Sequence, residues 1–178
     1  ACSAKDQQWL ESICPRMPVV LINRESEHFS TVCTDNEEAG LMAATRIRQK
    51  GYTEVAIFAS KHAYVATGQR VQAFMRSCEK LGIKVDEKYI LRGTSTLHGG
   101  YEVGKQYCAL KEPPKMIFSD SDSIALGALS AFHEHGLLIP QNAEILSIGM
   151  LGPDTTAYSV PSVSVVEMPD KEIGQQVI

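Results

Sequence analysis

The sequence predicts an α/β fold in which helices cover both faces of a parallel sheet. Short apolar runs alternate with longer stretches of helical periodicity along the 178 residues. From the second run onward the expected strands recur about every 30 residues, the length of a βαβ unit. Each is apolar almost throughout, as expected when both sheet faces are covered. The expected strands are residues 19–22, 54–59, 88–91, 115–119 and 144–148.

The stretches between these runs carry helix start and stop signals. Asp35 stands at the expected N-cap of one helix, and the two glutamates after Asn36 favour the positive end of its dipole. Gly51, Gly82 and Gly136 end three of the helices. The expected helices are residues 5–14, 36–50, 71–81, 123–135 and 170–178. The first has only a trace of strand before it and the last stops abruptly, so we expect missing residues at both ends.

Composition excludes several classes of protein. Seventeen basic and twenty-one acidic side chains give a net charge of −4, and the basic ones form no stripe. The chain itself is therefore not expected to bind a phosphate backbone. No apolar run approaches the roughly 18 residues of a membrane span, so no membrane partner is expected.

The five cysteines are odd in number, widely spaced and without a Cys-x-x-Cys pair. That pattern favours neither zinc binding nor redox chemistry, so we expect buried small hydrophobes in a reducing cytoplasm. They are Cys2, Cys14, Cys33, Cys78 and Cys108.

Some motifs could suggest an enzyme or a metal site, but the residues in and around them do not support either. The run from Gly99 to Gln106 has phosphate-loop spacing, but Gln106 replaces the magnesium-binding Ser or Thr and Gly104 lies at helical spacing. His133 and His135 end a helix, where they point in diverging directions. No nucleophile is paired with a base. We therefore expect no enzyme activity, no cofactor and no metal.

Polar residues follow several of the expected strands, where open α/β sheets bind their ligands. Asp35, Arg70, residues 119–122 and residues 149–154 all map to such carboxyl ends. Each has a structural alternative, since Asp35 and Asp122 fit helix caps and Arg70 fits a surface ion pair. Ionisable groups at three separate strand ends nevertheless favour one binding site.

These features come together in a resemblance to the LacI/GalR family of bacterial transcriptional regulators. The similarity covers nearly the whole chain, as ordered motifs at matching intervals. They include residues 18–24, 35–40 and 50–52, an Arg-x-x-Gly-Phe-like run at 70–74, an Asn-Asp-x-x-Ala-x-Gly-like run at 121–128, and residues 136–140 and 158–166.

The resemblance implies a two-lobed, periplasmic-binding-protein-like effector domain with parallel sheets flanked by helices, incomplete at the N-lobe and the C-terminus. Residues 1–50 are then expected to form part of the N-lobe and residues 51–162 the C-lobe. Residues 163–178 are expected to cross over and return a helix to the N-lobe. The family's DNA-binding helix-turn-helix headpiece is absent from the sequence.

Matched position by position, the resemblance implies effector contacts from six residues. They are Asp35, Arg70, Ser95, Ser121, Asp122 and Leu151. Arginine and aspartate suit hydroxyl-rich ligands. Ser121, Leu151 and Ser95 stand where the family usually has Asn, Asp and an aromatic residue, and Met168 stands near a usual Gln. These departures argue against a plain hexose and leave a smaller, phosphorylated, acidic or partly apolar effector open.

The resemblance therefore implies a cytoplasmic repressor or other regulator that senses a sugar or sugar derivative. Effector bridging Asp35 to Arg70 and Asp122 is expected to close the lobes and alter operator binding by the missing headpiece. A homodimer is expected, and residues 123–135 offer either a two-fold interface or a buried helix. The alternatives are an extracytoplasmic sugar-binding protein of a transport system and, more remotely, an enzyme.

Overall fold

A computed structural model describes residues 4–13, 18–62, 65–149 and 151–177 of the chain. The helices are α1 (Ala4–Ile13), α2 (Asn36–Gln49), α3 (Val65–Lys80), α4 (Leu97–Cys108), α5 (Asp122–Glu134), α6 (Gly152–Ala157) and α7 (Asp170–Val177). The strands are β1 (Val20–Ile22), β2 (Ser30–Val32), β3 (Glu54–Ser60), β4 (Lys84–Gly93), β5 (Met116–Ser119), β6 (Glu144–Gly149) and β7 (Ser164–Glu167). From β2 onward, strands and helices alternate along the chain.

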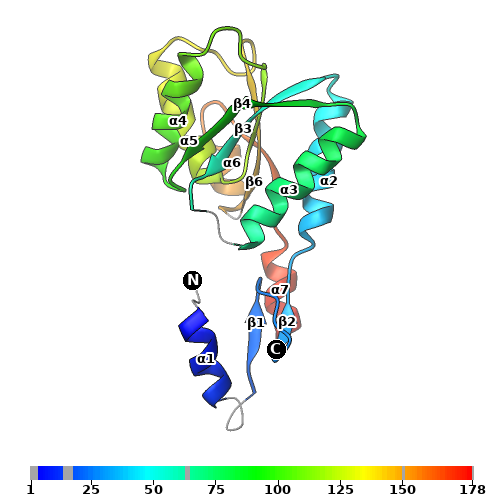
Figure 1. The fold of residues 1–178 in the computed structure, drawn as a ribbon. Coiled ribbons are helices and arrows are strands. Elements are labelled where there is room, and N and C mark those ends of the chain that lie inside the picture. The colour runs from blue at the N-terminus through cyan, green and yellow to red at the C-terminus, as the bar shows by residue number, and fades with distance from the viewer. Residues whose placement is uncertain (1–3, 14–17, 63–64, 150, 178) are drawn as a thin grey trace.

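The larger part of the molecule is a five-stranded parallel sheet between two helical layers. Its strand order is β4-β3-β5-β6-β7, and every neighbouring pair is parallel. Helices α2 and α3 pack together on one face, while α4 and α5 pack together on the other (Figure 1). We call this part the C-lobe. The predicted α/β class is therefore confirmed.

Two hydrophobic cores, one on each side of the sheet, stabilise the C-lobe. The ring of Phe74 on α3 stacks on Phe118 of β5, with centroids 3.8 Å apart. On the opposite face the rings of Phe58 and Tyr107 form a T-shaped pair with centroids 5.6 Å apart, and the buried Tyr107 donates its hydroxyl proton to the carbonyl of Pro114. Strands that are apolar on both faces supply both cores.

The smaller part contains β1 paired in parallel with β2, together with α1 and α7. Helix α7 contacts β2. Two segments, residues 33–35 and 168–169, join it to the C-lobe (Figure 1). We call this part the N-lobe segment.

The division between the lobes differs from the expected one at residues 50 and 162. Ala43, Ala44 and Ile47 of α2 are fully buried in the C-lobe core, and β7 pairs with β6 in the C-lobe sheet. The apolar packing of α2 thus assigns residues 36–50 to the C-lobe, and the pairing of β7 with β6 assigns residues 163–167 to it.

Helix α5 packs as a core helix through its apolar side, as one of the two interpretations of residues 123–135 expects. Ala125, Ala128 and Phe132 are buried between α4 and the sheet, so they are not available to a partner. Cys78 is buried as expected, but Cys33 is exposed, which corrects its predicted burial. Cys2 and Cys14 lie outside the described residues.

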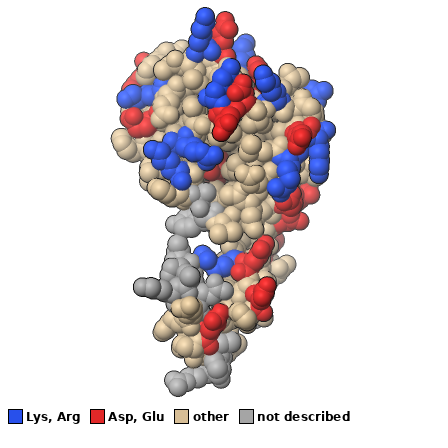
Figure 2. All heavy atoms as spheres, in the orientation of Figure 1, with Lys and Arg blue, Asp and Glu red and all other residues tan. Residues whose placement is uncertain are grey.

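Charged side chains of both signs are interspersed over the face of the molecule that Figure 2 shows. This distribution agrees with the absence of a basic stripe in the sequence. Among the described residues, no helix combines the length and apolar character that a membrane crossing needs.

The contact between α2 and α3 depends on the absence of a side chain at Gly40. A Cβ there would lie 2.5 Å from the backbone nitrogen of Phe74 and 2.8 Å from Ala73. Gly40→Ala is therefore expected to lower the free energy of unfolding by about 1–2 kcal/mol, because overpacking outweighs the better helix propensity of alanine. Thermal unfolding should show a Tm at least about 2 °C lower.

Gly68, in α3, is the matched control because a Cβ there meets nothing within 4 Å. Gly68→Ala should raise the free energy of unfolding by up to about 1 kcal/mol. Equal changes in the two variants would contradict the close approach of the helices.

Candidate functional site

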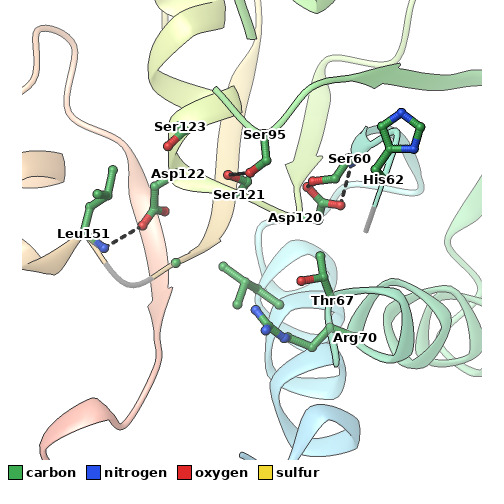
Figure 3. A pocket seen from close by; sticks show the side chains of 12 residues that line it. Ser60, His62, Thr67, Arg70, Ser95, Asp120, Ser121, Asp122, Ser123 and Leu151 are labelled. Carbon is green, nitrogen blue, oxygen red and sulfur yellow. Dashed lines mark hydrogen bonds between the residues drawn. The ribbon is translucent and has the colours of Figure 1, made fainter. Parts of the chain in front are cut away.

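A cavity of about 250 Å³ opens at the carboxyl edge of the C-lobe sheet. The ends of β3, β5 and β6 meet there with the first turns of α3 and α5, so polar side chains converge from several elements (Figure 3). The lining residues are Ser60, His62, Thr67, Arg70, Ser95, Asp120, Ser121, Asp122, Ser123, Ile148, Gly149 and Leu151.

Arg70 extends from α3 into this cavity and is only 8% exposed. Its Nε donates to Oδ1 of Asn36 at 3.1 Å, and Nδ2 of Asn36 donates to Gln69. The first residue of α2 thus orients the guanidinium. Burial lowers the pKa of Arg70, while the negative charge of Asp120 opposes that change.

Asp120 is a buried carboxylate held by Ser60. Its Oδ2 accepts from the backbone nitrogen of Ser60 at 2.7 Å, and its Oδ1 accepts from the Ser60 hydroxyl at 2.9 Å. Burial raises the pKa of Asp120, and the bonds from Ser60 together with the charges of Arg70 and Arg92 oppose that rise. This pair connects the end of β3 to the end of β5.

Asp122 occupies the first turn of α5 and is 3% exposed. Its Oδ2 accepts from the backbone nitrogen of Leu151 at 3.1 Å. Among the described residues, its Oδ1 is buried without a hydrogen-bond partner. Gly149 permits this position, because a Cβ there would lie within 1.9 Å of the carboxylate.

Two hydroxyls join the turns that follow β4 and β5. The Oγ atoms of Ser95 and Ser121 lie 2.9 Å apart, and the Ser119 hydroxyl donates to the carbonyl of Ser121 at 2.8 Å. Leu151 is 45% exposed and supplies an apolar part of the wall. The cavity therefore combines one guanidinium, two carboxylates and several hydroxyls.

Five of the six residues expected from the resemblance line this cavity. They are Arg70, Ser95, Ser121, Asp122 and Leu151. Asp35 does not join them: it is the N-cap of α2, and its Oδ1 accepts from the backbone nitrogen of Glu38 at 2.9 Å. It lines a separate groove with Arg76 and Gln69, so its side chain serves its own helix.

Sequence reasoning missed Ser60, Thr67 and Asp120 as individual site residues. Ser60 ends β3, so the rule that ligands bind beyond strand ends offered a signal for it. Asp120 lay inside the polar run 119–122, but its pairing with Ser60 depends on two strands being adjacent. No group of three or more metal-binding side chains lies together in the described part of the chain.

A parallel sheet with a polar cavity at its carboxyl edge defines a small-molecule-binding α/β domain. Residues 44–178 match the family model described as periplasmic binding protein-like domain. The chain belongs to this family, in the form of a LacI/GalR effector-binding domain.

Curated relatives and a solved structure agree with this assignment. The HTH-type transcriptional repressor CytR of Escherichia coli (strain K12) is 30% identical over 161 residues, covering 89% of this chain and 47% of that protein. PurR of Vibrio cholerae (strain M66-2), also an HTH-type transcriptional repressor, is 25% identical over 151 residues, covering 85% of this chain and 44% of that protein. The chain therefore spans under half the length of these repressors.

A LacI family transcription regulator from Clostridium acetobutylicum has the same fold, with a TM-score of 0.90 and 33% identity. The similarity covers 98% of this chain and 65% of that one.

The structural role of Asp35 can be tested with two variants. Asp35→Ala should lower the free energy of unfolding by about 1 kcal/mol, because the α2 N-terminus loses its cap. Asp35→Asn should change it little, since asparagine caps as well as aspartate. Chemical denaturation measures both, and equal losses would show that the charge of Asp35 matters rather than its capping bond.

Proposed function

We propose that the chain is the effector-sensing part of a bacterial transcriptional repressor. The observation that carries this proposal is the convergence of Arg70, Asp122 and Ser121 at the carboxyl edge of the sheet. A cavity with fixed donors and acceptors suits a small polar molecule such as a sugar or a sugar derivative. The regulators among its relatives favour this function over transport or catalysis.

The proposed mechanism is a population shift between two lobe arrangements. Two short segments, residues 33–35 and 168–169, join the lobes. The first leads directly into α2, and the second directly follows β7. Asn36, which follows the first segment directly, orients Arg70. An effector that binds Arg70 thereby also affects Asn36, the residue next to a joining segment. It changes the populations of the two lobe arrangements only if it binds one of them more tightly.

In this proposal DNA contact belongs to a helix-turn-helix headpiece outside this sequence, and the protein acts in the cytoplasm, where its operator lies. The net charge of −4 supports a separate DNA-binding element. A homodimer would bring two headpieces to one operator. Its interface would not use Ala125, Ala128 or Phe132 of α5, because these side chains are buried in the C-lobe core.

Arg70→Ala tests the proposed site. A saturating effector stabilises a folded protein by RT ln(1 + [L]/Kd), about 2.7 kcal/mol at a hundredfold excess over Kd. The variant should lose this stabilisation, because the buried guanidinium that faces the cavity is gone. The measurement is a thermal-shift screen of sugars, sugar phosphates and nucleosides on the protein that carries this chain.

Arg76→Ala is the matched control on the same helix, since Arg76 is half exposed and pairs with Glu37 outside the cavity. It should retain the full shift. A thermal shift of unchanged size in Arg70→Ala would reject the proposed site. Operator binding that does not change when a stabilising compound is added would reject the regulatory function.

A further inference from the structure

We propose that a chain of side-chain hydrogen bonds carries the state of Arg70 to the contact between the lobes, with Asn36 as its positioning residue. From the cavity outward, its members are Arg70, Asn36, Gln69 and Glu25. This inference rests on the proposed function, since it names the route by which the same cavity acts on the lobes.

The four side chains come from three separate parts of the sequence. Gln69 and Arg70 are neighbours in α3, and Asn36 begins α2. Glu25 lies between β1 and β2, in the N-lobe segment. Figure 1 shows α2 and α3 both beginning at the end of the C-lobe that faces this segment. The last bond of the chain therefore joins the two lobes.

Every bond in the chain has the same direction. Nε of Arg70 donates to Oδ1 of Asn36 at 3.1 Å, and Nδ2 of Asn36 donates to Oε1 of Gln69 at 3.1 Å. Nε2 of Gln69 then donates to Oε1 of Glu25 at 3.5 Å. A guanidinium only donates and an ionised carboxylate only accepts, so the two charged ends fix the orientation of both amides. Because hydrogen bonds in a chain polarise one another, a change at Arg70 affects the bond to Glu25.

The chain weakens toward the N-lobe segment. Arg70 is 8% exposed and its bond to Asn36 is partly buried, whereas Glu25 is exposed and accepts the longest of the three bonds. This last bond lies at a groove of about 500 Å³ that Gln69 and Glu25 both line, outside the effector cavity. A hydrogen bond that water can replace contributes little net stability. The contact can therefore open while both lobes stay folded.

The joining segment of residues 33–35 is held from both sides. Thr34 donates through its backbone nitrogen and its hydroxyl to Oδ1 of Asn23, both at 2.9 Å, which ties it to the end of β1. Asn36 is tied to α3 by the chain. Along this segment, a rotation between the lobes is therefore concentrated in the backbone of Asp35. Such a rotation changes the distance that the last bond of the chain must span.

The geometry of Arg70 allows an effector and Asn36 to bind it together. Its bond to Asn36 uses Nε, and in the described part of the chain no hydrogen bond engages its two terminal nitrogens. An effector oxygen can bind these nitrogens without displacing Asn36, and any shift of the guanidinium is passed to Asn36. The empty and the occupied cavity thus differ in how well the chain holds Glu25.

The lobe contact is tested by exchanging its two side chains. Gln69→Glu still accepts from Asn36, but its second oxygen meets the Glu25 carboxylate, so the contact should open. Hydrogen–deuterium exchange of residues 30–35 should then be about three- to tenfold faster in the protein that carries this chain. Glu25→Gln, added to Gln69→Glu, supplies a donor from the other side and leaves the net charge as it was. This double variant should restore the original exchange rate.

The cavity end of the chain is tested with Arg70→Ala, which removes the donor that orients Asn36. This variant should also accelerate exchange of residues 30–35, measured relative to residues 54–60 of the buried strand β3, which report global unfolding. Arg76→Ala is the matched control, because Arg76 lines the same groove but pairs with Glu37. It should leave the exchange unchanged.

Three results would overturn the inference. They are unchanged exchange in Gln69→Glu, a double variant that exchanges as fast as Gln69→Glu alone, and equal acceleration by Arg70→Ala and Arg76→Ala. Rescue by the double variant separates the chain from a merely structural role, since a damaged fold would not recover on a second substitution.

The two proposals fail in different ways. A compound that stabilises the protein through Arg70, together with unchanged exchange in Gln69→Glu, overturns the chain and leaves the sensing function intact. Restored exchange in the double variant, together with no thermal shift from any of the sugars, sugar phosphates and nucleosides, supports the chain and rejects the sensing function.

Discussion

The hydrogen bond between the Asp122 carboxylate and the backbone nitrogen of Leu151 holds together the two strand ends on which the cavity depends. Asp122 begins α5 after β5, while Leu151 follows β6, so this bond spans the turns beyond two neighbouring strands. It forms only because Gly149 leaves room for the carboxylate. On the other side, Ser60 binds Asp120 and ties β3 to β5 in the same way. Backbone geometry at the sheet edge thus positions the polar groups.

The segments that join the two lobes lie where the carboxyl edge of the C-lobe sheet faces the N-lobe segment. Helix α2 packs on the C-lobe, yet its first residue, Asn36, both follows a joining segment and orients Arg70. Asp35 caps the helix at that point. Asp35 therefore contributes to the region through helix geometry, which explains why the sequence placed it near the site although its side chain lies outside the cavity.

Long periodic elements could be predicted from the sequence, because their apolar pattern repeats over many residues. The helices that end at Gly51, Gly82 and Gly136 agree with the structure within a few residues at their C-termini, and these glycines have positive φ. Strands β2 and β7 were missed because they are short and lie partly exposed. Strand β4 extends well beyond the predicted residues 88–91. The prediction was too short because charged side chains on this edge strand conceal its apolar pattern.

Site residues that follow strand ends could also be predicted from the sequence, whereas hydrogen bonds between different elements could not. The match of Arg70 and Asp122 to family motifs located the cavity, and five of the six expected residues line it. The bond from Ser60 to Asp120 requires the strand order, which no local pattern encodes. The burial of Asp122 and its bond to the backbone of Leu151 likewise depend on the two strands being adjacent.

The most direct measurement is a crystal structure of the protein with the compound that stabilises it most. The account predicts that this compound occupies the C-lobe cavity, with a polar atom about 3 Å from the Arg70 guanidinium. A compound bound outside this cavity, or bound within it without a contact to Arg70, would contradict the account.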